Sequence, residues 1–435
     1  MRPTRILLLF PVLSSALKAS VWDGAGTSLW RLKEQVFDFV NDPFRQSRVP
    51  QFILDAQHPW IIENKRTLER LSDARGFLCS APNNSSIGGG LELPQDLFHY
   101  LEIDNNRHDI DRPGWPNALD RSLEIKDCPA ALEQVRIFKI YIYVCDGKWQ
   151  PLWKKALEPS EPPQQLLDAF GDVLSNMTSL ETLTWIIRAS DVHYFEEAFQ
   201  DRGLVLPSVA RLEPGAMSHF LVSLCPNLRT LETDSTWRYH EYPYGLEQRP
   251  QELLLQAAGT ASRLTRFAMN AQHLGWTQEL VTALADTLPG IESLGLCGSI
   301  DPHSMHSGSP TPNDMLRDRL QALHDLKNLT HLDLPPSHTL GVGFDGGAWC
   351  GNAYGGYSGW LYKRDVTRQS AEAVDRAAAI VVERLPRLQS FTIGGYHSNL
   401  TRQENGTVQA IFPWTGRMDE WIEQVVPPRD RYDEL

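Results

Sequence analysis

Three short stretches of this 435-residue chain come close to known chemical motifs, and each departs from its motif at a position that the chemistry needs. The acidic stretch that begins at Asp104 resembles a calcium-binding loop, but Trp115 stands where the final glutamate belongs. Residues 356–360 approach the turn that carries a nucleophilic serine, but the second glycine is missing. His303 and His306 have the spacing of a helical metal pair, but the proline and glycine around them favour a loop. We therefore predict no catalytic residue, no metal site and no cofactor.

Aromatic residues concentrate in two segments, residues 237–250 and 335–366, which give the best candidates for ligand binding. Residues 341–362 hold six aromatic residues among eight glycines and few charges. Long irregular loops in compact proteins usually carry function, and aromatic faces suit sugar rings and peptide side chains. The alternative is that both loops fold back as packing. The candidate contact residues are Trp349, Tyr354, Tyr357, Trp360, Trp237 and Tyr239.

The N-terminus has the three parts of a secretory signal peptide. Arg2 and Arg5 precede the apolar run 6–17, and the small residues Ala19 and Ser20 follow it. The run is too short to cross a bilayer, and no later segment reaches about 18 uninterrupted apolar residues. A buried first strand or a misassigned start codon is the alternative. We expect residues 1–19 to be a signal peptide and the protein to enter the secretory pathway without inserting into a membrane.

Asparagine glycosylation sequons favour the same compartment, because a sequon is used only in the secretory lumen. Chance would give about two such triplets at this composition, and the chain has six. The first two overlap, so that we expect at most one of them to carry a glycan. The acceptor residues are Asn83, Asn84, Asn176, Asn328, Asn399 and Asn405.

The chain ends in a tetrapeptide that resembles a retrieval signal of the endoplasmic reticulum. These residues are Tyr432, Asp433, Glu434 and Leu435, and the signal normally has a basic residue in place of the tyrosine. A receptor that reads this charge would bind the tetrapeptide more weakly. Both extracellular and reticulum-lumen locations therefore stay open.

Charge and composition exclude two classes of partner. The chain has 41 basic and 54 acidic residues, which gives a net charge of −13. Phosphates of nucleic acids or anionic lipids would be repelled by such a surface. We therefore expect a protein, peptide or glycan ligand and no nucleic acid.

Eight stretches of the chain repeat one spacing, in which an apolar residue is followed by others three, six and eight positions later. The third residue of each stretch serves as its anchor. The spacing is typical of the strand in a leucine-rich repeat, which cannot bury its apolar face alone and must stack on its neighbours. The anchors are Phe138, Leu183, Leu212, Leu231, Phe267, Leu294, Leu332 and Phe391.

Helices are predicted between these strands, over residues 251–261, 277–288, 311–323 and 368–384, because apolar residues recur there three and four apart. Several of the predicted strands are preceded by a short sequence motif such as Leu385-Pro386-Arg387-Leu388. The proline in this motif ends a helix before the chain turns into the strand. Strand and helix in alternation predict a parallel sheet.

From about residue 130 to 396 the chain resembles the irregular leucine-rich repeats that follow an F-box in many substrate receptors. The resemblance implies an α/β solenoid with a curved parallel sheet, helices on its convex side and a helical N-terminal cap. An ordinary α/β sheet with short strands is the alternative. The expected parts are the signal peptide 1–19, a cap region 20–127, the solenoid 128–396 with its aromatic insertions, and a C-terminal cap and tail 397–435.

Six cysteines suit an oxidising compartment, but their pairing cannot be chosen from sequence. Cys225 occupies an apolar repeat position and could be a buried thiol. Cys128 and Cys145 flank the first repeat strand, and Cys79 lies upstream. If a bridge exists, we favour one that ties the first repeat to the N-terminal region.

The N-terminal region is not repetitive. Helices are expected over residues 29–40 and 61–71, with an exposed linker at 80–90. Residues 93–97 resemble the opening of an F-box, the module that docks a ubiquitin-ligase adaptor. The polar stretch 104–114 then departs from that pattern, and the adaptor would be in a different compartment from a glycoprotein.

These features together favour a non-enzymatic glycoprotein of the secretory pathway that binds a protein, peptide or glycan through its repeats and aromatic loops. Two alternatives stay open. If the leader is not a signal peptide, the chain would be an F-box-type receptor of a ubiquitin ligase. A hydrolase built on the same sheet is the other.

Overall fold

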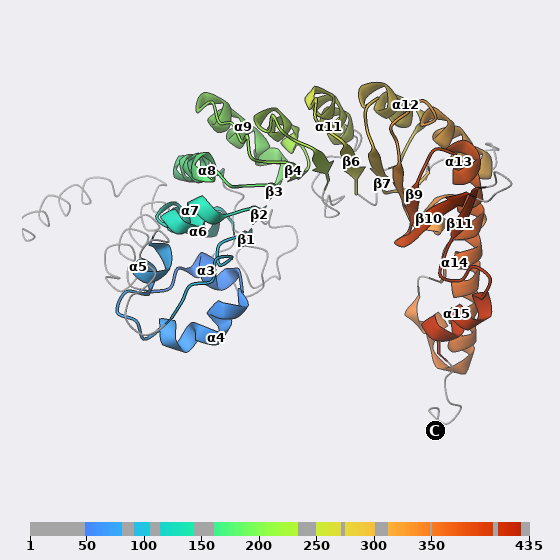
Figure 1. The fold of residues 1–435 in the computed structure, drawn as a ribbon, viewed down its shortest axis with the longest axis horizontal. Coiled ribbons are helices and arrows are strands. Elements are labelled where there is room, and N and C mark those ends of the chain that lie inside the picture. Colours follow the sequence, from blue (N-terminus) through green and yellow to red (C-terminus); the bar gives the residue numbers. More distant parts are fainter. Residues whose placement is uncertain are drawn as a thin grey trace, which may run out of the picture.

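The computed structural model of the chain describes residues 48–80, 91–104, 114–142, 161–233, 249–270, 275–300, 312–348, 350–402 and 408–427. In this part the protein is a mixed α/β structure with one large, mostly parallel sheet (Figure 1). The expected signal peptide and the helix expected at 29–40 lie outside the described residues. No helix in the described ranges has the length and apolar character needed to cross a membrane.

The sheet contains eleven strands whose order across the sheet is their order in the chain. Neighbours from β1 to β9 pair in parallel, and β10 pairs antiparallel with both β9 and β11. The strands are β1 Tyr100–Asp104, β2 Ile137–Ile142, β3 Thr182–Ile187, β4 Arg211–Pro214, β5 Thr230–Glu232, β6 Arg266–Met269, β7 Ser293–Leu296, β8 His331–Leu334, β9 Ser390–Ile393, β10 Tyr396–Arg402 and β11 Val408–Ile411.

The eight predicted stretches form β2 to β9, which confirms the predicted parallel sheet. Their anchor residues are partners in the strand register from Phe138 in β2 to Phe391 in β9. Each of the eight anchor side chains is fully buried. The repeated apolar residue is therefore one continuous row of core side chains.

Strand β1 was not expected from the sequence. Its Leu101 and Ile103 pair with Phe138 and Ile140 of β2, so β1 extends the parallel sheet by one strand. The repeat spacing is present there except at its first position, where Gln95 replaces the apolar residue. Residues 95–98 form a turn that leads almost directly into this strand.

Helices link the parallel strands and lie on one side of the sheet from α8 to α12 (Figure 1). The four predicted helices are present as α11 to α14. The Thr277 side chain caps α12 by accepting a hydrogen bond from the Leu280 N–H at 3.3 Å. The α-helices are α8 Gln164–Asn176, α9 Val192–Asp201, α10 Leu221–Leu224, α11 Arg249–Thr260, α12 Gln278–Thr287, α13 Pro312–Ala322 and α14 Gly356–Arg384; short 3₁₀ helices are η2 Ala189–Asp191, η3 Ser218–Phe220, η6 Ser337–Thr339 and η7 Gly351–Tyr354.

The connections differ at the two ends of the strands. Five links from helix to strand have the same length, residues 177–181, 225–229, 261–265, 288–292 and 385–389. Links from strand to the next α-helix vary widely, and the longer ones are residues 143–163, 233–248, 297–311 and 335–355. Variation in length is therefore concentrated at the carboxyl ends of the strands.

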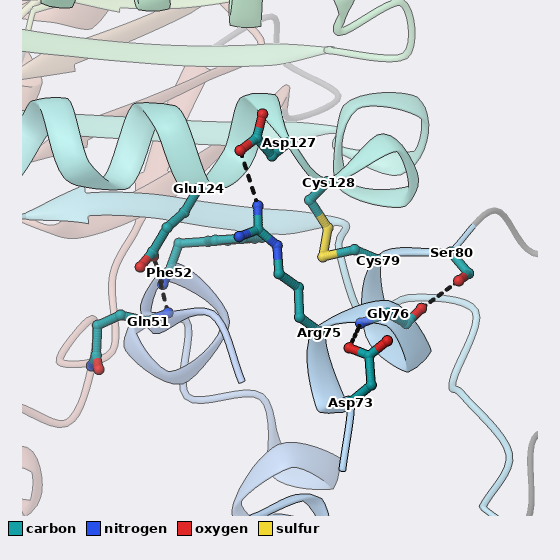
Figure 2. The surroundings of a disulfide bond; sticks show 10 residues. All are labelled: Gln51, Phe52, Asp73, Arg75, Gly76, Cys79, Ser80, Glu124, Asp127 and Cys128. Atoms are coloured by element: carbon teal, nitrogen blue, oxygen red, sulfur yellow. Dashed lines mark hydrogen bonds and ion pairs between the residues drawn. A yellow bond between two sulfur atoms is a disulfide. The ribbon is translucent and has the colours of Figure 1, made fainter. Parts of the chain in front are cut away.

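The N-terminal helices are joined to one another by polar contacts and a disulfide, and α3 and α6 pack against β1. They are α3 Gln51–Asp55, α4 Pro59–Leu68, α5 Ala74–Cys79, α6 Trp115–Lys126 and α7 Pro129–Gln134. Cys79 at the end of α5 is bonded to Cys128, just before α7 (Figure 2). This matches the bridge favoured from sequence. Cys145 lies outside the described residues, and burial raises the pKa of the Cys225 thiol to about 12.

The C-terminal part corrects the expectation of a long aromatic loop. Helix α14 begins at Gly356, twelve residues before the predicted start, so that the last third of segment 335–366 is helical. Charged and polar residues from Lys363 to Gln369 obscured the apolar period there, although they are good helix formers. After β11 the chain returns to pack α15, Met418–Val425, against α14.

Candidate binding face

One face of the sheet carries polar residues that are exposed to solvent or form hydrogen bonds and ion pairs with one another. Side chains alternate between the two faces of a strand, so that the residues before and after each buried anchor point away from the core. We call this side the open face. Its central residues are Arg211, Glu213, Glu232, Arg266, Ala268, Ser293, Gly295, His331, Asp333, Ser390 and Thr392.

Glu232 of β5 is the buried centre of a charged network on this face. Its side chain is 8 % exposed and lies between two arginines from the neighbouring strands. Arg211 of β4 donates to Glu232 Oε2 at 2.6 Å, and the Nε of Arg266 of β6 donates to Oε1. Arg211 also pairs with Glu213, which accepts a hydrogen bond from Thr184 at 2.9 Å. The network therefore begins at β3.

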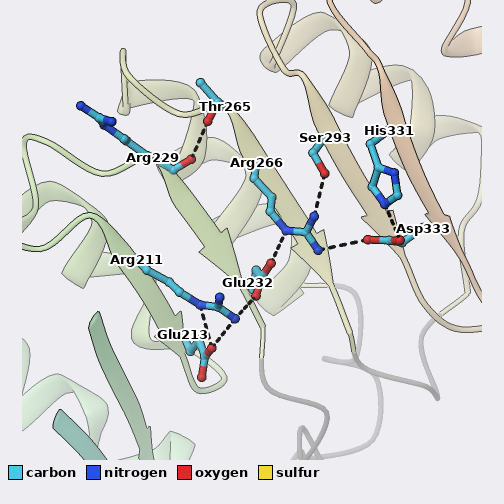
Figure 3. A network of polar contacts seen from close by, with 9 residues as sticks. All are labelled: Arg211, Glu213, Arg229, Glu232, Thr265, Arg266, Ser293, His331 and Asp333. Carbon is cyan, nitrogen blue, oxygen red and sulfur yellow. Dashed lines mark hydrogen bonds and ion pairs between the residues drawn. The ribbon is translucent and has the colours of Figure 1, made fainter. Parts of the chain in front are cut away.

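Arg266 extends this network over the next two strands, as Figure 3 shows. Its guanidinium donates to Ser293 Oγ of β7 at 2.9 Å and to Asp333 Oδ2 of β8 at 3.0 Å. The other oxygen of Asp333 lies 2.8 Å from His331 Nε2, and His331 Nδ1 lies 2.8 Å from Ser390 Oγ of β9. A continuous chain of polar contacts thus crosses the sheet from β3 to β9.

Contacts within the network favour the ionised forms of Arg266 and Asp333. Burial alone would lower the pKa of Arg266, but its contacts with Glu232 and Asp333 outweigh this and raise the pKa. Burial would raise the pKa of Asp333, but the hydrogen bond with His331 and the nearby charge of Arg266 lower it. Removing one member of a shielded ion pair leaves its partners unpaired, which costs more than the pair contributes.

Small residues lie between Glu232 and Asp333 of the network. Ala268 of β6 pairs in register with Gly295 of β7, which pairs with Asp333. A Cβ atom added at Gly295 would be only 2.7 Å from Ala268 Cβ, so no larger residue fits there without a shift of the strands. The guanidinium of Arg266 thus crosses from Glu232 to Asp333 past two small side chains.

Ser390, His331 and Asp333 have the order of contacts found in serine hydrolases, but two of these residues have groups that are engaged in other contacts. An oxyanion must be stabilised by donors that are held ready for it. The N–H of Ser390 is used in the sheet, where it donates to Thr330 O at 3.2 Å. Asp333 is also shared with Arg266, which weakens its support of the imidazole.

The predicted aromatic contact residues gather elsewhere, as far as they are described. Tyr357 and Trp360 stack with ring centroids 5.5 Å apart in the first turns of α14, and the Trp360 indole N–H donates to Pro427 O at 2.8 Å. Tyr354 contacts Tyr362 with centroids 5.4 Å apart. These rings pack at the N-terminal end of α14, partly as the packing alternative expects. Trp237, Tyr239 and Trp349 lie outside the described residues.

The described glycosylation asparagines are all exposed. Asn176 ends α8, and Asn328 lies in the turn before β8, facing outward as a glycan there would require. Asn399 lies on β10 opposite Ser390 and therefore on the open face, with its Oδ1 3.2 Å from His397 Nε2. Asn83, Asn84, Asn405 and the terminal residues Tyr432, Asp433, Glu434 and Leu435 lie outside the described residues.

The motif-like stretches of the sequence give no metal or nucleophile site in the described ranges. Ser358 lies in the first turn of α14, and no cluster of three metal-binding side chains is present among the described residues. His303, His306 and most of the calcium-like loop lie outside those ranges. No protein-family model matches the chain, and no curated protein matches it.

Sequence reasoning missed the polar network, although a signal for it was present. Six of the ten positions directly before and after the anchors of β4 to β8 hold arginine, glutamate, histidine or aspartate. Once a strand's anchor is known, these positions must share the opposite face. The contacts between them additionally required the order of the strands.

Proposed function

We propose that the chain is a non-enzymatic leucine-rich-repeat glycoprotein of the secretory pathway, which binds a protein, peptide or glycan through the open face of its sheet. The observation that carries the proposal is the polar network from Thr184 to Ser390. Its side chains are held by one another, so that little rotamer entropy would be lost when a partner binds. Such pre-arranged charges confer specificity on an interface.

Two features support a repeat solenoid with a concave open face. Each unit supplies one strand and its connection, in chain order, and five of the links from helix to strand have the same length of five residues. The close approach of positions 268 and 295 also fits a sheet that bends toward the open face, because side chains on a concave surface converge. Stacked repeats with an elongated concave surface are typical binding scaffolds.

The position of the long connections agrees with a binding role. In parallel sheets ligands usually bind beyond the carboxyl ends of the strands, where loops can vary without disturbing the core. The aromatic segments 237–250 and 335–366 both follow carboxyl ends, those of β5 and β8. Trp237, Tyr239, Trp349, Tyr354, Tyr357 and Trp360 stay candidates for contact with the ligand.

The proposed compartment is supported by the disulfide, the sequons and the leader-like N-terminus. A disulfide persists in an oxidising environment, and Cys79–Cys128 is formed. Asn176, Asn328 and Asn399 are exposed and could each accommodate a glycan. Whether the protein is secreted or retained would depend on Tyr432–Leu435.

The compartment is tested by expressing the full chain in cultured secretory cells. We expect the protein to be cut after the leader and to shift to lower mass on treatment with an N-glycosidase. Deleting residues 432–435 would increase secretion if the tetrapeptide acts as a retrieval signal. An unshifted cytosolic protein with an intact N-terminus would contradict the proposal and favour the F-box-type alternative.

The binding face is tested by presenting the full chain to arrays of glycans and of secreted proteins. We expect hits whose binding falls at least about tenfold in Arg266→Ala and is unchanged in Arg317→Ala. Arg317 is a matched control, because it forms ion pairs with Asp314 and Glu383 on the helical side. Hits that bind both variants and the wild type equally would contradict a role of the open face.

A further inference from the structure

The last strand of the sheet has backbone groups that point away from the molecule's other strands. In an antiparallel pair, each residue directs both its N–H and its C=O to the same side. The Leu400 N–H of β10 donates to Gln389 O on the β9 side at 3.0 Å. Its partner Ala410 in β11 must therefore face away from β10, as must Val408, which pairs with Arg402. Within the described residues the sheet ends at β11.

A groove lies beside this strand edge, between β11 and α14. It encloses about 850 Å³ and is open to solvent. Its apolar wall is formed by Ala378 and Val382 of α14, Val408 and Ala410 of β11, and the following residues Phe412 and Met418. The Phe412 and Trp414 rings stack 5.0 Å apart and give the groove a rigid floor. An exposed strand edge next to an apolar groove is the arrangement that accepts an added strand.

One acidic side chain in the groove forms no ion pair within the described residues, although the charge of the adjacent Arg376 acts on it and Arg417 also lines the groove. Asp375 of α14 accepts a hydrogen bond from the Trp414 indole N–H at 3.0 Å, and none of the described lysines or arginines forms an ion pair with it. Burial raises the pKa of this carboxyl group. Glu383 in the same groove differs, because it lies 3.4 Å from Arg317 and 3.5 Å from Arg384. Asp375 is therefore the group that can take up a positive charge from a ligand.

We propose that this edge binds an extended peptide from a partner protein as a twelfth strand beside β11. The peptide backbone would bond to the outward groups of Val408 and Ala410. Its alternate side chains, about 7 Å apart, would enter the groove. Apolar residues would contact Val382 and Phe412, and one lysine or arginine would pair with Asp375. This site is separate from the open face of the sheet and does not depend on it.

The probe that tests the site is a fluorescein-labelled peptide, Val-Thr-Lys-Thr-Val-Thr-Val, whose odd residues would face the groove. Matched probes carry glutamate in place of the lysine or N-methyl groups on alternate backbone amides. We expect the full chain to bind the lysine peptide about tenfold tighter than the glutamate peptide. Methylation of the bonded amides should abolish binding, because it removes the donors of the added strand. Fluorescence anisotropy measures each affinity.

Three variants of the protein and one control separate the contributions. Asp375→Lys should reverse the preference between lysine and glutamate peptides, and Asp375→Asn should reduce it about three- to tenfold if the reversal variant folds poorly. Ala410→Pro removes one outward N–H but no bond to β10, and should weaken all peptides at least about tenfold. Glu420→Gln changes the same charge at an exposed position of α15 outside the groove lining and should leave binding unaltered.

Several outcomes would overturn the proposal. Equal affinity for the lysine and glutamate peptides would exclude Asp375 as the recognition group. Unchanged binding by a folded Ala410→Pro variant would exclude strand addition. A concentration-dependent dimer in sedimentation, lost in Ala410→Pro while no peptide binds, would assign the edge to a second copy of the chain.

Discussion

The two ends of the sheet are finished in different ways. At the N-terminal end, helices α3 and α6 pack on β1, and the Cys79–Cys128 bond ties α5 to the start of α7. Glu124 of α6 also accepts the backbone N–H groups of Gln51 and Phe52 at the start of α3 (Figure 2). At the C-terminal end, β11 directs backbone groups outward beside a groove.

This difference has a physical meaning. Stacked repeats leave an apolar end at each terminus, which must be covered. The chain covers the first end with its own helices and a covalent bond. At the second end the antiparallel strands and α15 leave a groove beside β11, where the proposed peptide would add a strand. We therefore expect perturbations of the two ends to have unequal effects.

The largest effect is expected from truncating the buried anchors at each end. Phe138 and Phe391 are both fully buried, and Phe→Ala in a core costs about 3–5 kcal/mol of unfolding free energy. Phe138→Ala should reach the upper part of that range, because β2 is enclosed by β1, β3 and the helices. Phe391→Ala should cost less, because residues beside the groove can move inward. Urea unfolding followed by tryptophan fluorescence tests this, and a larger loss for Phe391→Ala would contradict it.

Removing the disulfide should destabilise the N-terminal end alone. The bond closes a separation of 49 residues, and loss of such a bond typically costs about 2–4 kcal/mol. In the double variant Cys79→Ser and Cys128→Ser, hydrogen exchange should rise in α3 to β1 and stay constant in β9 to β11. Cys350→Ser, which removes an exposed unpaired thiol, is the control. Equal loosening of both ends would show that the bond has no local role.

A change in the middle of the sheet should affect both ends alike. Glu232→Gln leaves Arg211 and Arg266 without their shared carboxylate, and should cost about 1–3 kcal/mol. Thermal unfolding measures the loss. Glu292→Gln, on an exposed position before β7, should change little. If Glu232→Gln were as mild as this control, the network would not order the open face.

The smallest effects are expected in how the stability contributed by carboxyl groups of α8 and α14 depends on pH. Hydrogen bonds to Arg202 and Lys126 lower the pKa values of Asp168 and Asp172 in α8, so their stabilising contribution is lost as pH falls through the lowered pKa values. Burial raises the pKa of Asp375 in α14, so its ionisation destabilises the fold as pH rises above 4. Asp172→Asn should thus lower stability at pH 7, and Asp375→Asn should raise it. Melting temperatures between pH 3 and pH 7 test both signs, and equal shifts would refute the distinction.

The sequence predicted the repeated strands because one apolar spacing determines both their existence and their burial. It missed β1, where Gln95 breaks that spacing, and it extended the aromatic loop into α14, where polar residues hide the helical period. It could not find the network or the groove. The contacts of Arg266 join residues on three strands that are 27 to 67 positions apart from it, and only the strand order brings them together.

The most direct test of the contrast between a closed and an open end is residue-resolved hydrogen exchange along β11 in the full chain. We expect protection to alternate, with slow exchange at Ile411, whose N–H donates to Ser398 Oγ at 3.0 Å, and fast exchange at Val408 and Ala410. In β1, Leu101 and Ile103 face β2, so the matched outward position is Glu102, whose N–H should exchange as slowly as the central strands because α3 and α6 pack on this end. Slow exchange at Val408 and Ala410 in the protein alone would mean that this edge is already covered, and would contradict the open end.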